Sequence, residues 1–263
     1  MTNLPLSQSG KSALETATEA IKQAGEILLA HFHRKKEIKE KSKSNLVTEV
    51  DILSERAIAK LLTNEYPGYN VLSEELAPST PLTGYTWVVD PLAGTNNYAF
   101  GIPFFCINIA LVKDKDTLLG ITFDPLRGEL FRAEKGKGAY LNDSPIHVSE
   151  RASLETSLLS FDPGYNEIQG KKLLGTVTRL WPGVHSLRSM GSSSIALAYV
   201  ACGRVDLYVR SDLHPWDIAS GILLVKEAGG EVTDWQGKPA NLQKKEVIAA
   251  NNKLHQEFLG QLK

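Results

Sequence analysis

The pattern of apolar and polar positions changes twice along the chain. Apolar residues three or four positions apart predict amphipathic helices over residues 12–34 and from Asp51 onward. Over residues 104–133 the pattern becomes apolar runs divided by Asp, Gly and Pro, which predicts an antiparallel meander. Beyond the meander, strand and helix patterns alternate, as they do in layered α/β proteins. We therefore expect a mixed α/β fold with two halves, residues 1–150 and 151–263.

Two shorter strands are predicted to carry polar side chains. The run Val71-Leu72-Ser73 predicts a strand that ends in Glu74 and Glu75. Because neighbouring strand residues face opposite sides, we expect only one of these acids to point inward. In the second half, apolar and polar residues alternate over 205–210, which predicts a strand with one apolar face.

The most informative stretch runs from Trp87 to Tyr98. An apolar run ends at Asp90 and is followed by a Gly-Thr-Asn turn, which predicts a buried strand that delivers a carboxylate to a loop. Pro91 disfavours the helical conformation at Asp90, and Gly94 permits a backbone geometry that a side chain would block. Backbone amides after Gly94 could bind an anion if a helical turn begins there. A carboxylate beside such amides suits a hard metal ion bridging to phosphate, although an Asp of this kind also simply caps turns.

Three further acids lie in recognisable settings. Asp51 follows Leu-Val-Thr at the first turn of a predicted helix, Glu74 ends a strand, and Asp217 lies at the first turn of an apolar helix. Each position has an ordinary explanation, because acids stabilise helix N-termini and are usually exposed elsewhere. His214 has no partner histidine or cysteine at a metal-binding spacing, so we expect it to be structural.

Taken together, the four stretches resemble the signatures of the inositol monophosphatase family, the Mg²⁺-dependent, lithium-sensitive phosphomonoesterases. The matching patterns are Leu-Val-Thr-x-x-Asp, Glu-Glu, Asp-Pro-(Ile/Leu)-Asp-Gly-Thr and Trp-Asp-x-Ala-x-Gly, in the family's order from Leu46 to Gly230. The resemblance implies a five-layer α-β-α-β-α sandwich of the inositol monophosphatase and fructose-1,6-bisphosphatase type. It also implies a homodimer, with each active site between the two halves of the chain.

The resemblance also assigns roles to residues. Asp51 and Thr95 would orient the attacking water, and the amides of Gly94 and Thr95 would hold the phosphate. The catalytic residues would be Asp51, Glu74 and Thr95, and the ligands for two or three Mg²⁺ ions would be Glu74, Asp90, the Leu92 carbonyl and Asp217.

The sequence departs from the family pattern at Ala93, where the signature has its second Asp. Alanine has no donor atom, so the second metal site loses ligand number and negative charge, which together set the affinity for hard cations. We expect a weakened second site and little turnover. The chain is then either a disabled form of an active enzyme or a naturally inactive relative that binds a phosphate ligand or a partner.

The substrate is less constrained by the sequence. By the resemblance, inositol enzymes carry an acid seven residues before the Asp217 position, whereas this chain has Arg210. Arg210 suits a second phosphate or a carboxylate, or alternatively forms only a surface ion pair. Ser192 and Ser193 are candidate hydroxyl partners at a helix start. Inositol monophosphate, fructose 1,6-bisphosphate and a 3′-phosphorylated nucleotide therefore all remain candidate substrates.

Composition and charge exclude some classes of function. The chain has 263 residues, enough for a sizeable core, and a net charge of −1, which gives no reason to expect nucleic acid as a partner. No apolar run approaches the roughly 20 residues of a membrane span, and no apolar signal core is visible, so we expect a cytoplasmic protein without a membrane partner. Cys106 and Cys202 are expected to be buried thiols rather than a disulfide. The basic segment 31–43 is either a solvated face or a flap whose Lys41 or Lys43 closes over an anionic substrate.

Overall fold

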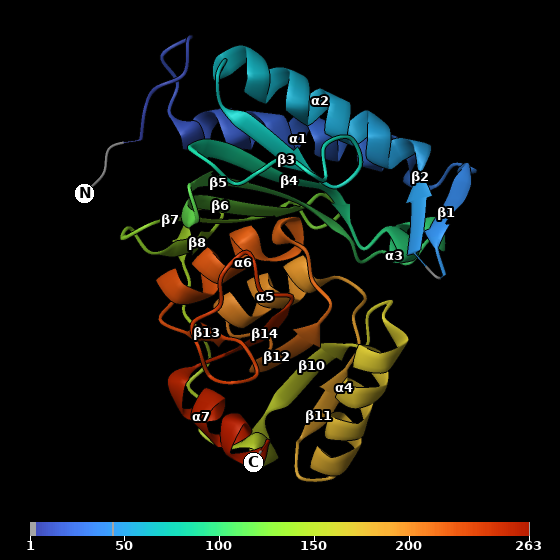
Figure 1. The fold of residues 1–263 in the computed structure, drawn as a ribbon, viewed down its shortest axis with the longest axis vertical. Coiled ribbons are helices and arrows are strands. Elements are labelled where there is room, and N and C mark those ends of the chain that lie inside the picture. The colour runs from blue at the N-terminus through green and yellow to red at the C-terminus, as the bar shows by residue number, and fades with distance from the viewer. Residues whose placement is uncertain (1–3, 44, 263) are drawn as a thin grey trace.

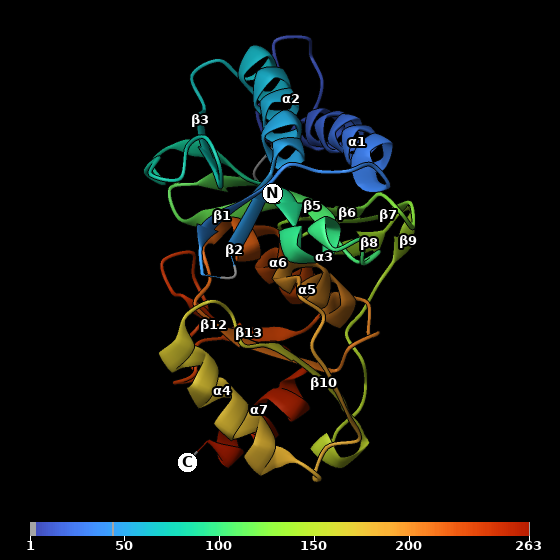
Figure 2. The same ribbon diagram turned by 90° about the vertical axis from the view of Figure 1, so that its right-hand side faces the viewer.

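The computed structural model describes residues 4–43 and 45–262, and their helices and sheets stack in five layers. Helices and sheets alternate from the top to the bottom of Figure 1, and the turned view of Figure 2 shows the same order. The helices of the two outer layers and of the central layer are α1 (Ala13–Phe32) with α2 (Glu49–Glu65), α4 (Glu167–Leu180) with α7 (Asn252–Gln261), and α5 (Ser193–Ala201) with α6 (Pro215–Glu227). This arrangement confirms the mixed α/β, five-layer architecture expected from the sequence.

The first sheet contains the predicted meander. Its strands are hydrogen-bonded in the order β3-β4-β5-β6-β7-β8-β9, and only the β3–β4 pair is parallel. The strands are β3 (Asn70–Ser73), β4 (Tyr85–Ala93), β5 (Cys106–Lys113), β6 (Asp116–Asp124), β7 (Glu129–Glu134), β8 (Ala139–Leu141) and β9 (Ser144–Pro145). Helices α1 and α2 cover one face and the central helices cover the other, so β4 and β5 are buried on both sides.

The second sheet has the order β11-β10-β12-β14-β13. Its strands are β10 (Leu158–Asp162), β11 (Ser186–Arg188), β12 (Leu207–Ser211), β13 (Glu231–Thr233) and β14 (Glu246–Ala250). The prediction of one apolar face for β12 was wrong, because Tyr208 is fully buried. Helices lie on both sides of this sheet, and the Tyr208 hydroxyl can be buried because it donates to Ser193 Oγ at 3.0 Å.

The central helices are packed closely against their neighbours. A Cβ added at Gly221 of α6 would lie 2.5 Å from Leu197 Cδ1 of α5, and one added at Gly120 of β6 would lie 2.8 Å from Ser220 Cα of α6. Glycine at these two positions therefore lets α6 approach both α5 and the first sheet. Helix α6 is buried along most of its length, as expected for the middle layer of a sandwich.

Smaller elements complete the chain. Residues of the basic segment form β1 (Ile38–Ser42), which pairs antiparallel with β2 (Asn45–Thr48) in a hairpin. The remaining elements are the short helix α3 (Thr95–Ala99) and the 3-10 helix η1 (Leu154–Thr156). Within the described part of the chain, no helix has the length and apolar character needed to cross a membrane. The division at residue 150 stays a prediction.

Candidate active site

The loop that follows β4 begins later than the sequence predicts, because the strand does not end at Asp90. Strand β4 continues to Ala93, Gly94 adopts a left-handed conformation (φ +94°), and α3 begins at Thr95. A Cβ at Gly94 would lie 3.2 Å from the Phe104 carbonyl oxygen and 3.3 Å from Ser192 Cβ, so only glycine fits this approach without displacement. The loop lies directly against the start of α5, which brings the two halves of the chain into contact.

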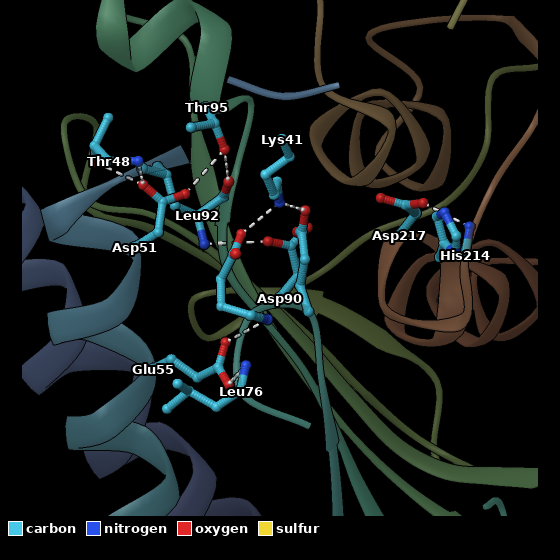
Figure 3. A network of polar contacts seen from close by, with 12 residues as sticks. Lys41, Thr48, Asp51, Glu55, Leu76, Asp90, Leu92, Thr95, His214 and Asp217 are labelled. Carbon is cyan, nitrogen blue, oxygen red and sulfur yellow. Dashed lines mark hydrogen bonds and ion pairs between the residues drawn. The ribbon is translucent and has the colours of Figure 1, made fainter. Parts of the chain in front are cut away.

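Asp51 and Thr95 form a hydrogen-bonded pair. Thr95 Oγ1 lies 3.0 Å from Asp51 Oδ1 and 2.9 Å from the Leu92 carbonyl oxygen (Figure 3). Asp51 also caps its own helix, because Asp51 Oδ2 accepts hydrogen bonds from the backbone N–H and the hydroxyl of Thr48. Burial raises the pKa of Asp51 to about 6, although the hydrogen bonds from Thr48 oppose the shift.

Glu74 and Glu75 do not face opposite sides as predicted. Strand β3 ends at Ser73, so the two acids lie in a bend, where the alternation of a strand no longer applies. Lys41 Nζ of the β1–β2 hairpin lies 2.7 Å from Glu74 Oε1 and 2.6 Å from Glu75 Oε1. The hairpin lysine thus contacts the acidic cluster, and both carboxylates point toward it.

Glu74 and Asp90 lie close enough to other carboxylates for repulsion to raise their pKa values. Burial raises the pKa of Glu74 to about 8. Lys41 opposes this shift, whereas repulsion from Asp217 and Glu75 adds to it. Burial also raises the pKa of Asp90 well above its ordinary value, and Glu74 and Asp217 raise it further. Buried acids that repel one another in this way are stabilised by a bound cation.

These acids line one pocket together with most of the other predicted residues. The cavity has a volume of about 250 Å³. The predicted residues on its wall are Glu74, Asp90, Leu92, Ala93, Gly94, Thr95, Ser192, Ser193, Arg210 and Asp217. Asp51 lies behind Thr95, through which it reaches the cavity.

The oxygen-rich donor set fits Mg²⁺, but its carboxylates are not yet gathered around one point. Among the described residues, no three His, Cys, Asp or Glu side chains form a ready-made metal-binding group. Glu74 turns to Lys41, while Asp217 Oδ2 accepts a hydrogen bond from the His214 N–H at 2.7 Å (Figure 3). Asp90 Oδ1 accepts a hydrogen bond from the Leu92 N–H at 3.1 Å. Side-chain rotations would therefore be needed before these oxygens could share a cation.

Two positioning residues were missed by the sequence analysis. Glu55, one turn after Asp51 on α2, is fully buried and accepts hydrogen bonds from the Glu75 and Leu76 N–H groups at 2.9 and 2.8 Å. Asp162, at the end of β10, accepts a hydrogen bond from the Gly191 N–H at 2.8 Å. The available signals were the four-residue spacing from Asp51 and the Asp162-Pro163-Gly164 run, which repeats the strand-to-loop pattern at Asp90.

Comparison with known proteins identifies the family. A sequence model of the inositol monophosphatase family matches residues 11–263. The chain belongs to the inositol monophosphatase family. Within it, the chain is 38% identical to inositol monophosphatase 3 of Solanum lycopersicum over 253 residues, with 94% of each chain covered.

Two further relatives extend this family comparison. The fructose-1,6-bisphosphatase/inositol-1-monophosphatase of Thermotoga maritima is 35% identical over 94% of each chain. The solved structure of the extragenic suppressor protein suhB from Bartonella henselae superposes with a TM-score of 0.88 at 32% identity, covering 95% of this chain and 98% of that one. The chain is therefore related to phosphatases of this superfamily along nearly its whole length.

Proposed function

We propose that the chain has the framework of a Mg²⁺-dependent phosphomonoesterase for a small phosphorylated sugar or polyol, and that Ala93 leaves this form with little turnover. The observation that carries the proposal is the convergence of Glu74, Asp90 and Asp217 on one pocket, from three distant parts of the sequence. The repulsion from Asp217 that raises the pKa of both Glu74 and Asp90 supports a shared cation site.

In this proposal, one Mg²⁺ would be held by Glu74, Asp90 and the Leu92 carbonyl, and a weaker second ion would be held by Asp90 and Asp217. Bound Mg²⁺ would supply charge stabilisation and a lowered pKa for a coordinated water. Thr95 Oγ1 orients the attacking water, because its hydroxyl hydrogen is engaged by Asp51 or Leu92 and its lone pairs remain free to accept. The amides of Gly94 and Thr95, at the start of α3, bind the phosphate oxygens.

Ala93 is the residue that limits activity in this proposal. It lies on the pocket wall and packs against Cys106 and Ile195, so the wall is apolar at this point. Ala93→Asp supplies the missing carboxylate, and we expect phosphate release to rise by about 100-fold or more. Ala93→Asn is the matched control, because asparagine has nearly the same size as aspartate but carries no charge.

The decisive assay measures Mg²⁺-dependent phosphate release by the unaltered chain, Ala93→Asp and Ala93→Asn. The substrates are inositol 1-phosphate, fructose 1,6-bisphosphate and a 3′-phosphorylated nucleotide. No gain for Ala93→Asp on any of them would defeat the view that the chain is a disabled enzyme. Retained partner or ligand binding without activity would then favour the alternative, an inactive binding protein.

Fructose-1,6-bisphosphatase activity is the second candidate. The cationic Arg210 on the pocket wall supports it, as does the activity named for the Thermotoga maritima relative. We also propose a cytoplasmic homodimer that Li⁺ inhibits once Ala93→Asp restores turnover. Light scattering of the purified chain tests the homodimer, and Li⁺ titration of Ala93→Asp tests the inhibition.

A further inference from the structure

Arg210 is a cation on the pocket wall without an acidic partner. Its Nη1 donates a hydrogen bond to Ser193 Oγ at 2.8 Å, while its Nε is buried with no hydrogen-bond partner in the described structure. Among the described residues, none places a carboxylate oxygen within ion-pairing distance of the guanidinium. The alternative of a surface ion pair is therefore not what the structure contains.

The nearest strand carboxylate is engaged elsewhere. Asp162 lies opposite Arg210 in the parallel β10–β12 register. Its side chain instead accepts hydrogen bonds from the Gly191 N–H at 2.8 Å, Ser189 Oγ at 3.0 Å and the Tyr208 hydroxyl at 3.4 Å. Asp162 thus orders the loop before α5 and leaves the charge of Arg210 without a direct partner. A largely buried cation in this state is costly to the fold unless a ligand compensates it.

The surroundings keep Arg210 charged and leave space beside it. Burial opposes the charge, but Tyr208, Asp217 and Asp162 outweigh this effect and raise the pKa of Arg210 above its ordinary value. Arg210 lines the cavity of about 250 Å³, which leaves space beside the guanidinium. A planar guanidinium with free N–H groups matches the geometry of phosphate and carboxylate.

We propose that Arg210 binds a second anionic group of the substrate, so that the pocket selects phosphate esters carrying a further phosphate or carboxylate over neutral polyol phosphates. This inference rests on the proposed function, because it assumes that the first phosphate lies at Gly94 and Thr95. Asp217 and Arg210 line the same cavity, which places the second group beside the proposed metal site. The second group could be a phosphate or a carboxylate, since both are anions, and pairs of ligands that differ in only one of these groups distinguish them.

The test measures binding by titration calorimetry on the unaltered chain in Mg²⁺, where slow turnover leaves the ligands intact. One pair is 6-phosphogluconate and glucitol 6-phosphate, which differ only in a carboxylate. The other is fructose 1,6-bisphosphate and fructose 1-phosphate, which differ only in a phosphate. We expect the doubly anionic member of at least one pair to bind about 10- to 100-fold more tightly, the value of a charge-assisted hydrogen-bond pair.

Three variants make the result specific to Arg210. Arg210→Gln should abolish the preference and leave the affinity for the singly phosphorylated ligand within about threefold. Arg210→Lys, which keeps the charge, should retain part of the preference. Arg204→Gln is the control, because Arg204 forms an ion pair with Glu129 outside the pocket and should keep the whole preference.

Two results would overturn the proposal. One is equal affinity within both ligand pairs, and the other is a loss in Arg210→Gln that is the same for both members of a pair. Failure of the proposed function has a different signature, since Ala93→Asp would then release no phosphate while the Arg210-dependent preference persisted. If none of the four phosphate esters bound in Mg²⁺, both proposals would be wrong.

Discussion

Glu55→Gln tests how the bend that carries Glu74 is held in place. The Glu55 carboxylate accepts hydrogen bonds from the Leu76 N–H at 2.8 Å (Figure 3), the Glu75 N–H at 2.9 Å and Ser73 Oγ at 2.5 Å. Glutamine keeps one acceptor oxygen, so its NH₂ group must face at least one of these donors. A hydrogen bond to a charged group contributes about 1.5–3 kcal/mol to the free energy of unfolding, and this contribution is lost in the variant. Removal of a buried charge partly offsets the loss. We expect the free energy of unfolding to fall by about 2 kcal/mol.

Urea denaturation of the metal-free protein at pH 7 measures this change, and calorimetric Mg²⁺ titration measures its effect on the site. Glu65→Gln is the matched control on the same helix, because the Glu65 carboxylate accepts from Ser9 at an exposed position. Its unfolding midpoint should stay close to that of the unaltered chain. Coincident midpoints for Glu55→Gln and Glu65→Gln would refute the reasoning, and unchanged Mg²⁺ affinity would show that the bend does not position Glu74.

Two further predictions concern packing and pH. Gly120→Ala should lower the free energy of unfolding by about 1–3 kcal/mol, because its Cβ would lie 2.8 Å from Ser220 Cα. The control is Gly175→Ala, where a Cβ would meet nothing within 4 Å. Equal urea midpoints for the two variants would contradict the prediction. Burial lowers the pKa of His255, so below pH 6.5 the unfolded chain binds a proton that the folded chain excludes, and stability falls as pH decreases. Relative to His255→Gln, urea unfolding should show the unaltered chain losing up to about 1.4 kcal/mol between pH 7.5 and 5.5, and parallel pH profiles would exclude this role.

Local constraints in the sequence predicted much of the fold. Ser12 begins α1 with a capping box, in which its hydroxyl accepts from the Glu15 N–H and Glu15 bonds back to the Ser12 N–H. Pro91 and Gly94 restrict the backbone on either side of Ala93, so the strand-to-loop transition could be placed within a few residues. These features depend on neighbours in the chain, which a sequence displays directly.

Features that depend on distant partners could not be predicted in the same way. The burial of Tyr208 requires the Ser193 hydroxyl, and the common orientation of Glu74 and Glu75 requires Lys41 from another strand. The uncompensated charge of Arg210 follows from the hydrogen bonds that engage Asp162 elsewhere. Composition and periodicity carry no information on which of several possible partners a carboxylate will choose.

The central helix layer lies between the two sheets, and the pocket has walls from both of them. Asp90 belongs to the first sheet and Arg210 to the second. A ligand that touches both walls is therefore a non-covalent cross-link, and its binding energy adds to the cohesion between the two sheets. A substitution that shifts the two sheets relative to α6 would weaken ligand affinity even where every helix and strand stays folded. Ligand affinity is thus a more sensitive gauge of how the sandwich is assembled than its circular dichroism.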